Sequence, residues 1–137
     1  MATNLVVPYI GCEEALANLI AEWGTLTIHL FSNNVTVSDT TVIANLTECT
    51  FGGYAAQTIG PWTAPASDGG NGAYTQAPLV TWTPTGSGLP QNVYGYYVTD
   101  AGGNLRWAQN DPNAPVVLSN TSQTYGVVPY FDVKSQY

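Results

Sequence analysis

The sequence predicts an all-β fold, an antiparallel β-sandwich of jelly-roll type with about eight short strands and one short N-terminal helix. Two observations favour this class. Short apolar or alternating segments recur along the chain, and turns rich in Gly, Pro, Asn and Asp separate them. No helices alternate with these segments, as they would in an α/β protein. A chain of 137 residues suits one domain with one substantial core.

The N-terminal region predicts an arm followed by a short amphipathic helix. Residues 4–10 are apolar and are counted as one of the eight predicted strands. Residues 13–23 have apolar side chains at helical spacing. These side chains are Leu16, Leu19, Ile20 and Trp23. Two acids in the first turn suit the positive end of the helix dipole, and Gly24 is a plausible stop. We therefore predict an arm and helix in residues 1–24 and a β-sandwich domain in residues 25–137.

From Thr25 the pattern changes to a period of two, which predicts a long strand with one buried face. The side chains that point one way are Leu26, Ile28 and Leu30, and those that point the other way are Thr27, His29 and Phe31. Residues 38–46 carry Ser or Asp as a cap before apolar residues, which predicts a helix of one or two turns. Residues 51–59 predict the next strand, with Gly52 and Gly53 as a bulge or a close contact.

The second half of the chain predicts a surface loop and a series of strands. Residues 60–72 are rich in Pro, Ala, Asp and Gly, which is typical of a loop. Strands are expected in residues 76–82, 92–99, 105–108, 115–118 and 124–133. The turn in residues 100–103 joins two of them into the clearest hairpin of the sequence.

Composition and charge bear on the possible partners. The chain is 45% hydrophobic and 8% charged, with a net charge of −7. Because only Arg106 and Lys134 are cationic, the chain cannot neutralise a run of phosphates, and we expect no binding of DNA or RNA. No stretch is long and apolar enough to span a membrane, and no basic region precedes the apolar N-terminus, so we expect synthesis and retention in a cytoplasm. So little charge indicates a surface that a partner covers, although a free monomer with an uncharged polar exterior is the alternative.

Catalytic and metal-binding residues are scarce, so we predict no enzyme activity, no cofactor and no metal. The single histidine, His29, falls within a strand, where a hydrogen bond to a neighbour is the simpler role. The acid pairs that could serve a glycosidase are Asp39 with Glu48 and Asp100 with Asp111. Oxygen ligands for calcium lie in residues 68–71 and 100–104, where turn formation explains the same residues. Cys12 and Cys49 are predicted to be semi-buried free thiols.

Aromatic residues are abundant, with nine tyrosines and four tryptophans. Tyr94, Tyr96 and Tyr97 lie near Trp82 and Trp107 in the predicted hairpin region, and strand alternation would put Tyr94 and Tyr96 on one face and Tyr97 on the other. Trp82 and Trp107 suit core filling. Aromatic side chains with a polar tip favour interfaces, so one of the tyrosine faces could contact a subunit or a sugar ring.

Five motifs occur in an order that resembles a family of small structural proteins of tailed phages. The motifs are residues 30–34 (LFSNN), 39–48, 51–54 (FGGY), 62–65 (WTAP) and, most clearly, 93–100 (VYGYYVTD) before Leu105. The resemblance covers residues 26–133, and its motifs form no catalytic signature. The N-terminal arm and helix are less typical of the family.

The resemblance implies a virion component on the capsid surface, a cement or decoration protein that binds major capsid protein subunits, commonly as a homotrimer. Such a brace needs a rigid sandwich and a contact surface of low charge. We expect the contacts to come from the N-terminal segment, from residues 60–72 and from the predicted hairpin region. The candidate contact residues are Tyr9, Trp23, Trp62, Tyr94, Tyr96 and Tyr97. The alternatives are a carbohydrate- or receptor-binding β-sandwich of a tail or fibre, recognised by exposed aromatic rings, and a small glycosidase.

Overall fold

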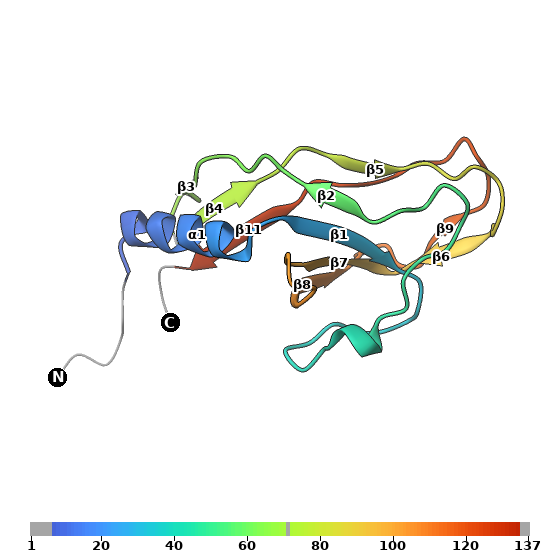
Figure 1. The fold of residues 1–137 in the computed structure, drawn as a ribbon, viewed down its shortest axis with the longest axis horizontal. Helices are drawn as coiled ribbons and strands as arrows, with labels where there is room; N and C mark the ends of the chain where they lie inside the picture. Colours follow the sequence, from blue (N-terminus) through green and yellow to red (C-terminus); the bar gives the residue numbers. More distant parts are fainter. Residues whose placement is uncertain (1–6, 71, 135–137) are drawn as a thin grey trace. The chain divides into compact units, whose positions relative to one another are not determined.

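A computed structural model describes residues 7–70 and 72–134, and it confirms the predicted fold class: an all-β sandwich with a short N-terminal helix (Figure 1). Contacts divide the chain into two compact units. Unit 1 takes the described residues of 7–24, 59–79 and 128–134, and unit 2 takes residues 25–58 and 80–127. The predicted boundary after residue 24 coincides with a boundary between the units, but the helix shares its unit with later segments.

The described residues form one α-helix, one 3₁₀ turn and eleven strands. They are α1 (Tyr9–Trp23), β1 (Leu26–Phe31), η1 (Ile43–Asn45), β2 (Gln57–Ile59), β3 (Ala66–Ser67), β4 (Gly72–Gln76), β5 (Val80–Trp82), β6 (Gln91–Val93), β7 (Gly95–Thr99), β8 (Leu105–Asn110), β9 (Val116–Leu118), β10 (Tyr125–Val127) and β11 (Tyr130–Lys134). The count exceeds the predicted eight because the segments predicted as single strands at 76–82, 92–99 and 124–133 each contribute to two strands. Each of these segments is divided where the chain leaves one sheet and joins another. In addition, β3 lies within the predicted loop of residues 60–72, whereas the strand predicted in residues 4–10 is not among the eleven.

Unit 1 is a three-stranded antiparallel sheet with α1 packed on one face. The strand order is β11-β4-β3. Cys12 and Leu16 of the helix and Ala73 of β4 are buried together, with Phe131 and Val133 of β11 packed against them. Side chains alternate between the two faces of a strand, so these residues define the helix-covered face of the sheet. The predicted amphipathic helix therefore packs on the sheet and is part of a core.

The helix begins earlier than predicted. Its first residue is Tyr9 instead of Glu13, and Pro8 precedes it with a φ of −55°. Proline is compatible with a helix start because its φ is already helical, and the Pro8 carbonyl accepts the N–H of Cys12 at 3.1 Å. Glu13 and the acid after it thus lie in the second turn. The apolar segment predicted as a strand is helical at Tyr9 and Ile10, and residues 4–6 lie outside the described residues. The predicted end at Gly24 is confirmed, with a φ of 67° that suits glycine.

Unit 2 contains a four-stranded antiparallel sheet of order β2-β1-β7-β8 and two two-stranded sheets, β10-β5 and β6-β9. The predicted alternation of β1 is confirmed, because Leu26, Ile28 and Leu30 are buried on one face. Trp82 of β5 is buried as well, and its indole N–H donates to the carbonyl of Ala55 at 2.8 Å. These contacts form the interior of the sandwich, in keeping with the core role predicted for Trp82.

The second face of β1 and β7 is also covered, which the alternation did not predict. Phe31 is buried with Tyr97 and Leu46, and Val35 and Val37 pack against them. In Figure 1 the segment between β1 and β2, drawn in teal around η1, leaves the end of β1 and returns to it. The helix predicted in residues 38–46 is reduced to the single 3₁₀ turn.

The segment after this turn is mostly irregular. The strand predicted in residues 51–59 is limited to β2, and Gly52 and Gly53 form a turn. The predicted close contact is confirmed, because a Cβ on Gly52 would lie 2.1 Å from the Ser87 Oγ and one on Gly53 would lie 2.9 Å from the Thr83 carbonyl oxygen. Only glycine permits this approach.

The predicted hairpin is confirmed as the antiparallel pair β7 and β8, with a register shift between Val98 and Thr99. Its turn depends on Asp100. One carboxylate oxygen of Asp100 accepts the N–H groups of Gly102 and Asn104, both at 2.9 Å, and the other accepts the Arg106 Nε–H at 2.8 Å. This bonding supports the interpretation of residues 100–104 as a turn.

Leu16 anchors the helix to its sheet, and its removal should weaken unit 1. The side chain is fully buried, so Leu16→Ala is expected to lower the free energy of unfolding by roughly 2–5 kcal/mol, through lost burial and the cavity left behind. Urea unfolding followed by circular dichroism measures this change. Ile10→Ala on the same helix is the control, because Ile10 is exposed. Equal losses in the two variants would contradict the packing described for α1.

Candidate functional site

Two of the predicted contact residues are buried inside the protein. The exposed fractions of Tyr96 and Tyr97 are 8% and 4%. The Tyr96 hydroxyl donates to Gln109 at 3.0 Å, and the Tyr97 ring stacks on His29 with centroids 4.5 Å apart. Because both faces of β7 are covered, these rings are not available to a partner. The prediction that Tyr96 and Tyr97 form a contact surface is therefore corrected.

The predicted grouping of Tyr94 with Tyr96 is also wrong. Tyr94 is half-buried and packs on the cluster that contains Phe31 and Tyr97, opposite to the expected face. Strand alternation fails here because the chain passes from β6 to β7, which belong to different sheets. The Tyr94 N–H donates to the Phe31 carbonyl at 2.9 Å, and its own carbonyl accepts the N–H of Asp111 at 2.8 Å.

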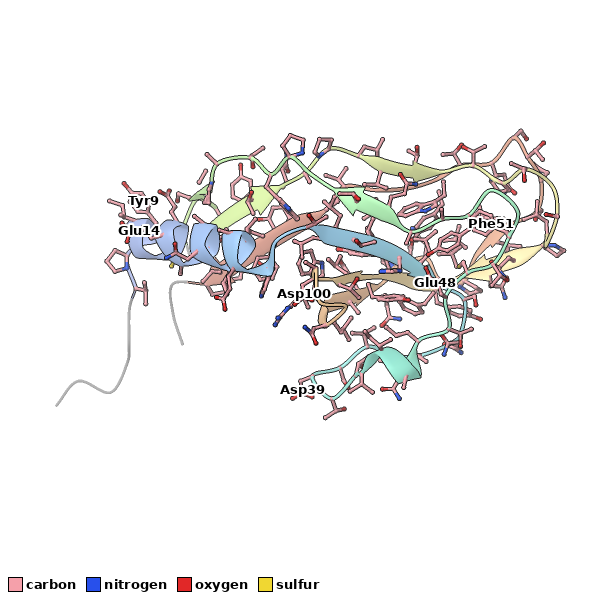
Figure 2. The ribbon with its side chains drawn as sticks, in the orientation of Figure 1. Tyr9, Glu14, Asp39, Glu48, Phe51 and Asp100 are labelled. Carbon is pink, nitrogen blue, oxygen red and sulfur yellow. The ribbon has the colours of Figure 1, made fainter. Side chains whose placement is uncertain are left out.

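The remaining predicted contact residues lie in different parts of unit 1. Tyr9 is 52% exposed. It lies at the start of α1 (Figure 2). Trp23 is half-buried at the other end of the helix, where its ring meets Phe131 edge-on at 5.3 Å. Trp62 is half-buried in the segment between β2 and β3. Of the six predicted residues, Tyr9 therefore presents most surface to a partner.

An aromatic surface that the sequence analysis missed lies on the sheet of unit 1. Tyr74 of β4 and Tyr130 of β11 stack with centroids 5.3 Å apart and ring planes 16° apart. Their neighbours in sequence pack against the helix, so alternation places both tyrosines on the opposite side of the sheet. We call this side the tyrosine face and define it by Tyr74, Gln76, Tyr130, Asp132 and Lys134. Tyr130 is 44% exposed.

Charged groups surround these tyrosines. The Lys134 ammonium contacts the Asp132 carboxylate and lies 3.8 Å from Asp68 Oδ2. The hydrogen bond to Asp132 raises the pKa of Lys134. Desolvation, followed by the negative charges of Asp132 and Asp68, raises the pKa of Tyr130. The tyrosine face thus has an aromatic centre beside charges of both signs. The sequence contained a signal for the tyrosine face, because side chains alternate between two faces in residues 72–76 and 130–134. It did not show that these two segments pair.

The other cation of the chain is also paired with its own carboxylate. Arg106 contacts Asp100 through Nη2 at 2.6 Å, in addition to the Nε contact. The backbone N–H of Asn104 and the side chain of Arg106 lower the pKa of Asp100 to about 2. Arg106 and Lys134 are therefore both paired with a carboxylate of the same chain.

A second polar network in unit 2 forms around the carboxylate of Glu48. Glu48 lies at the end of residues 32–48, the segment that covers the second face of β1 and β7 and that we call the covering segment. Its Oε1 accepts the Tyr54 hydroxyl at 2.6 Å and lies 2.9 Å from His29 Nδ1, and its Oε2 accepts the Tyr97 hydroxyl at 3.4 Å. A carboxylate only accepts, so His29 Nδ1 donates to Glu48, and His29 Nε2 shares a hydrogen bond with the Thr99 hydroxyl at 3.0 Å. His29 thus has the hydrogen-bonded strand role that its position predicted.

This network links the covering segment to β1. The Tyr54 hydroxyl, while donating to Glu48, accepts the backbone N–H of Leu30 at 3.1 Å. Burial alone would raise the pKa of Glu48, but hydrogen bonds from Tyr54 and His29 outweigh it and lower this pKa. Burial, followed by the charge of Glu48, raises the pKa of Tyr97 to about 12. The arrangement holds a charged carboxylate in place at neutral pH.

The acid pairs considered for a glycosidase belong to separate interactions. Glu48 joins the network above, whereas Asp39 is exposed in the loop before η1, away from Glu48 in Figure 2. Asp100 binds Arg106, and Asp111 accepts the Tyr125 hydroxyl at 2.6 Å. In the part of the chain that the structure describes, no hydrogen bond joins the members of either pair.

Two adjoining pockets form a groove between the covering segment and β8. One has a volume of about 390 Å³ and the other of about 280 Å³, and they share Thr41 and Leu105. Their lining is mainly polar on the side of Ser38 and Asp39, with Trp107 on the side of β8. The size is near the lower end of small-ligand sites, which run from roughly 300 to 1,000 Å³.

Cys12 and Cys49 are free thiols, as predicted. Both are buried, whereas a semi-buried state was expected. Burial, followed by the charge of Glu48, raises the pKa of the Cys49 thiol to about 12. Among residues 7–70 and 72–134, no three His, Cys, Asp or Glu side chains are placed to hold a metal ion.

No helix within the described residues is long and apolar enough to cross a membrane.

Comparison with protein-family models, with curated proteins and with solved structures finds no significant match to this chain. The resemblance to phage structural proteins therefore stays a prediction.

Tyr54 is the test of the network, because its hydroxyl bonds both the backbone N–H of the buried Leu30 and the half-buried carboxylate of Glu48. Tyr54→Phe is expected to lower the free energy of unfolding by about 1–3 kcal/mol, since the Leu30 N–H loses its acceptor. Chemical unfolding measures the loss. Tyr9→Phe removes the same atom from an exposed ring and should leave stability within experimental error. A Tyr54 variant as stable as wild type would show that the network does not hold the segment.

The lowered pKa of Glu48 predicts a dependence on pH. A carboxyl group whose pKa is lower in the folded state stabilises the fold above its unfolded pKa, and this contribution is lost as pH falls through the folded pKa. Glu48→Gln should therefore be less stable than wild type at pH 7, and the difference should shrink below the ordinary pKa of 4.5. Urea unfolding of both proteins at pH 7, 5 and 3 gives the comparison. A difference that is the same at all three values would exclude the charge of Glu48 as its cause.

Proposed function

We propose that this chain is a non-enzymatic structural protein of a tailed-phage virion, a cement or decoration protein that stabilises the head by binding major capsid protein subunits. The observation that carries the proposal is the tyrosine face, where the exposed Tyr130 stacks on the half-buried Tyr74. Aromatic side chains with polar tips and a low content of charge are typical of protein contact surfaces.

Charge supports a protein partner over a nucleic acid. The chain has a net charge of −7, and its two cations contact its own carboxylates. A phosphate backbone would meet a negative surface and would have to compete for these cations. We therefore propose that the chain lies on the capsid surface. We also propose that it assembles as a homo-oligomer, a trimer in the simplest case, and that it is made in the host cytoplasm.

The contacts that we propose for the N-terminal region are limited to the start of the helix. Removing residues 1–24 would take Cys12 and Leu16 out of the core of unit 1, so loss of capsid attachment in such a deletion would not identify a contact. The exposed side chains at the start of the helix, Tyr9 and Ile10, are the positions that could touch a partner without holding the fold.

Labelling of virions tests the proposal directly. Antibodies raised against the purified chain, coupled to gold, are expected to mark the heads of phage particles purified from the cells that produce it. The purified chain should also bind to heads that lack it, and light scattering should give the mass of an oligomer. Labelling of tails alone, or particles without label, would contradict a role on the head.

The groove beside β8 keeps a second candidate function in view, a carbohydrate- or receptor-binding module of a tail or fibre. Hydroxyl, amide and carboxylate groups near Trp107 are suited to a neutral sugar. Glycan-array binding that is lost in Asp39→Ala, together with labelling of tails, would favour this function over the cement role.

A further inference from the structure

We infer that the tyrosine face is the surface through which copies of this chain associate. The inference rests on the proposed function, since a cement protein that acts as an oligomer requires a contact between copies. It goes further by naming the surface and its occupant, a second copy of the chain.

The first step is the packing of the sheet in unit 1. Phe131 and Val133 of β11 and Ala73 of β4 pack toward α1, which uses one face of the sheet. The intervening side chains of the same strands face the other way, and three of them, Gln76, Tyr130 and Lys134, are exposed. The sheet therefore has one face in the core and one face with accessible aromatic surface.

The second step is the state of the two rings. Tyr74 is half-buried under its stacking partner, whereas Tyr130 keeps 44% of its surface exposed. Two further exposed apolar residues in the same unit, Leu79 and Val128, flank these strands in sequence. The stacked arrangement holds the outer ring in one orientation, so little conformational freedom is lost when a partner covers it.

The third step identifies the occupant from charge. Two copies with a net charge of −7 repel one another, so a contact between them needs a surface where charges of opposite sign lie together. The tyrosine face carries the only lysine of the chain, and the Lys134 side chain is 52% exposed between Asp68 and Asp132. A surface with both signs side by side can complement itself, because Lys134 of one copy can face a carboxylate of the next.

Light scattering on variants of the full chain tests the inference. Tyr130→Asp places a third acid beside Asp68 and Asp132, and it is expected to reduce the mass to that of one 14.5 kDa chain at concentrations where the wild type is an oligomer. Tyr9→Asp is the matched control, because it adds the same charge at an exposed tyrosine of the same unit. It should retain the oligomer.

Two measurements separate loss of contact from loss of fold. Circular dichroism and thermal unfolding should be the same for both variants, and the neutral Tyr130→Ser replaces Tyr130→Asp if the acid unfolds unit 1. Lys134→Glu should weaken association at least tenfold at low salt and less at high salt, where repulsion is screened. Wild-type mass retained in folded Tyr130→Asp, or equal dissociation of Tyr9→Asp, would overturn the inference.

Labelling of heads distinguishes this inference from the proposed function. A wild-type chain that is monomeric at all concentrations but still marks phage heads would overturn the inference and leave the cement role intact. A Tyr130→Asp variant that keeps its oligomer but no longer binds heads would overturn it too, because the face would then contact the capsid protein. An oligomer that Tyr130→Asp dissociates, in a chain absent from virions, would support the inference and contradict the function.

Discussion

Burial of both faces of the β1 and β7 pair is the constraint on which unit 2 depends. Antiparallel sheets commonly leave one face to solvent, and the alternation of β1 suggested this arrangement. Instead the segment between β1 and β2 folds over the second face, and its apolar side chains pack on Phe31 and Tyr97. Burial leaves polar groups on that face that need partners. Glu48, at the end of the covering segment, supplies them to His29, Tyr54 and Tyr97.

This constraint also decides which aromatic residues are left for function. The tyrosines of the motif in residues 93–100 were the natural contact candidates, yet covering both faces places Tyr96 and Tyr97 inside. In unit 1, the helix packs on one face of the sheet, and Tyr74 and Tyr130 lie on the other face, where Tyr130 is exposed. This is the face that we propose for contacts between copies.

The sequence was sufficient for those features that depend on local chemistry. The apolar period of β1, the glycine stop of α1 and the Asp-Gly turn of the β7-β8 hairpin are each determined by neighbouring residues. It was insufficient where the outcome depends on distant partners. The change of sheet at Tyr94 depends on hydrogen bonds to Phe31 and Asp111, and the stack of Tyr74 on Tyr130 depends on a register between segments more than fifty residues apart.

The scarcity of cations bears both on the proposed protein partner and on the inferred contact between copies. With nine acids and two basic residues, each cation contacts an acid of its own chain, Arg106 in the hairpin turn and Lys134 on the tyrosine face. Arg106 serves local structure, since it shares Asp100 with the backbone of the turn. The Lys134 ammonium contacts Asp132 and lies near Asp68, and its side chain remains half exposed beside an aromatic pair. For the association that we infer, repulsion between acidic copies and attraction at this mixed patch together would favour a single orientation, as an ordered assembly requires.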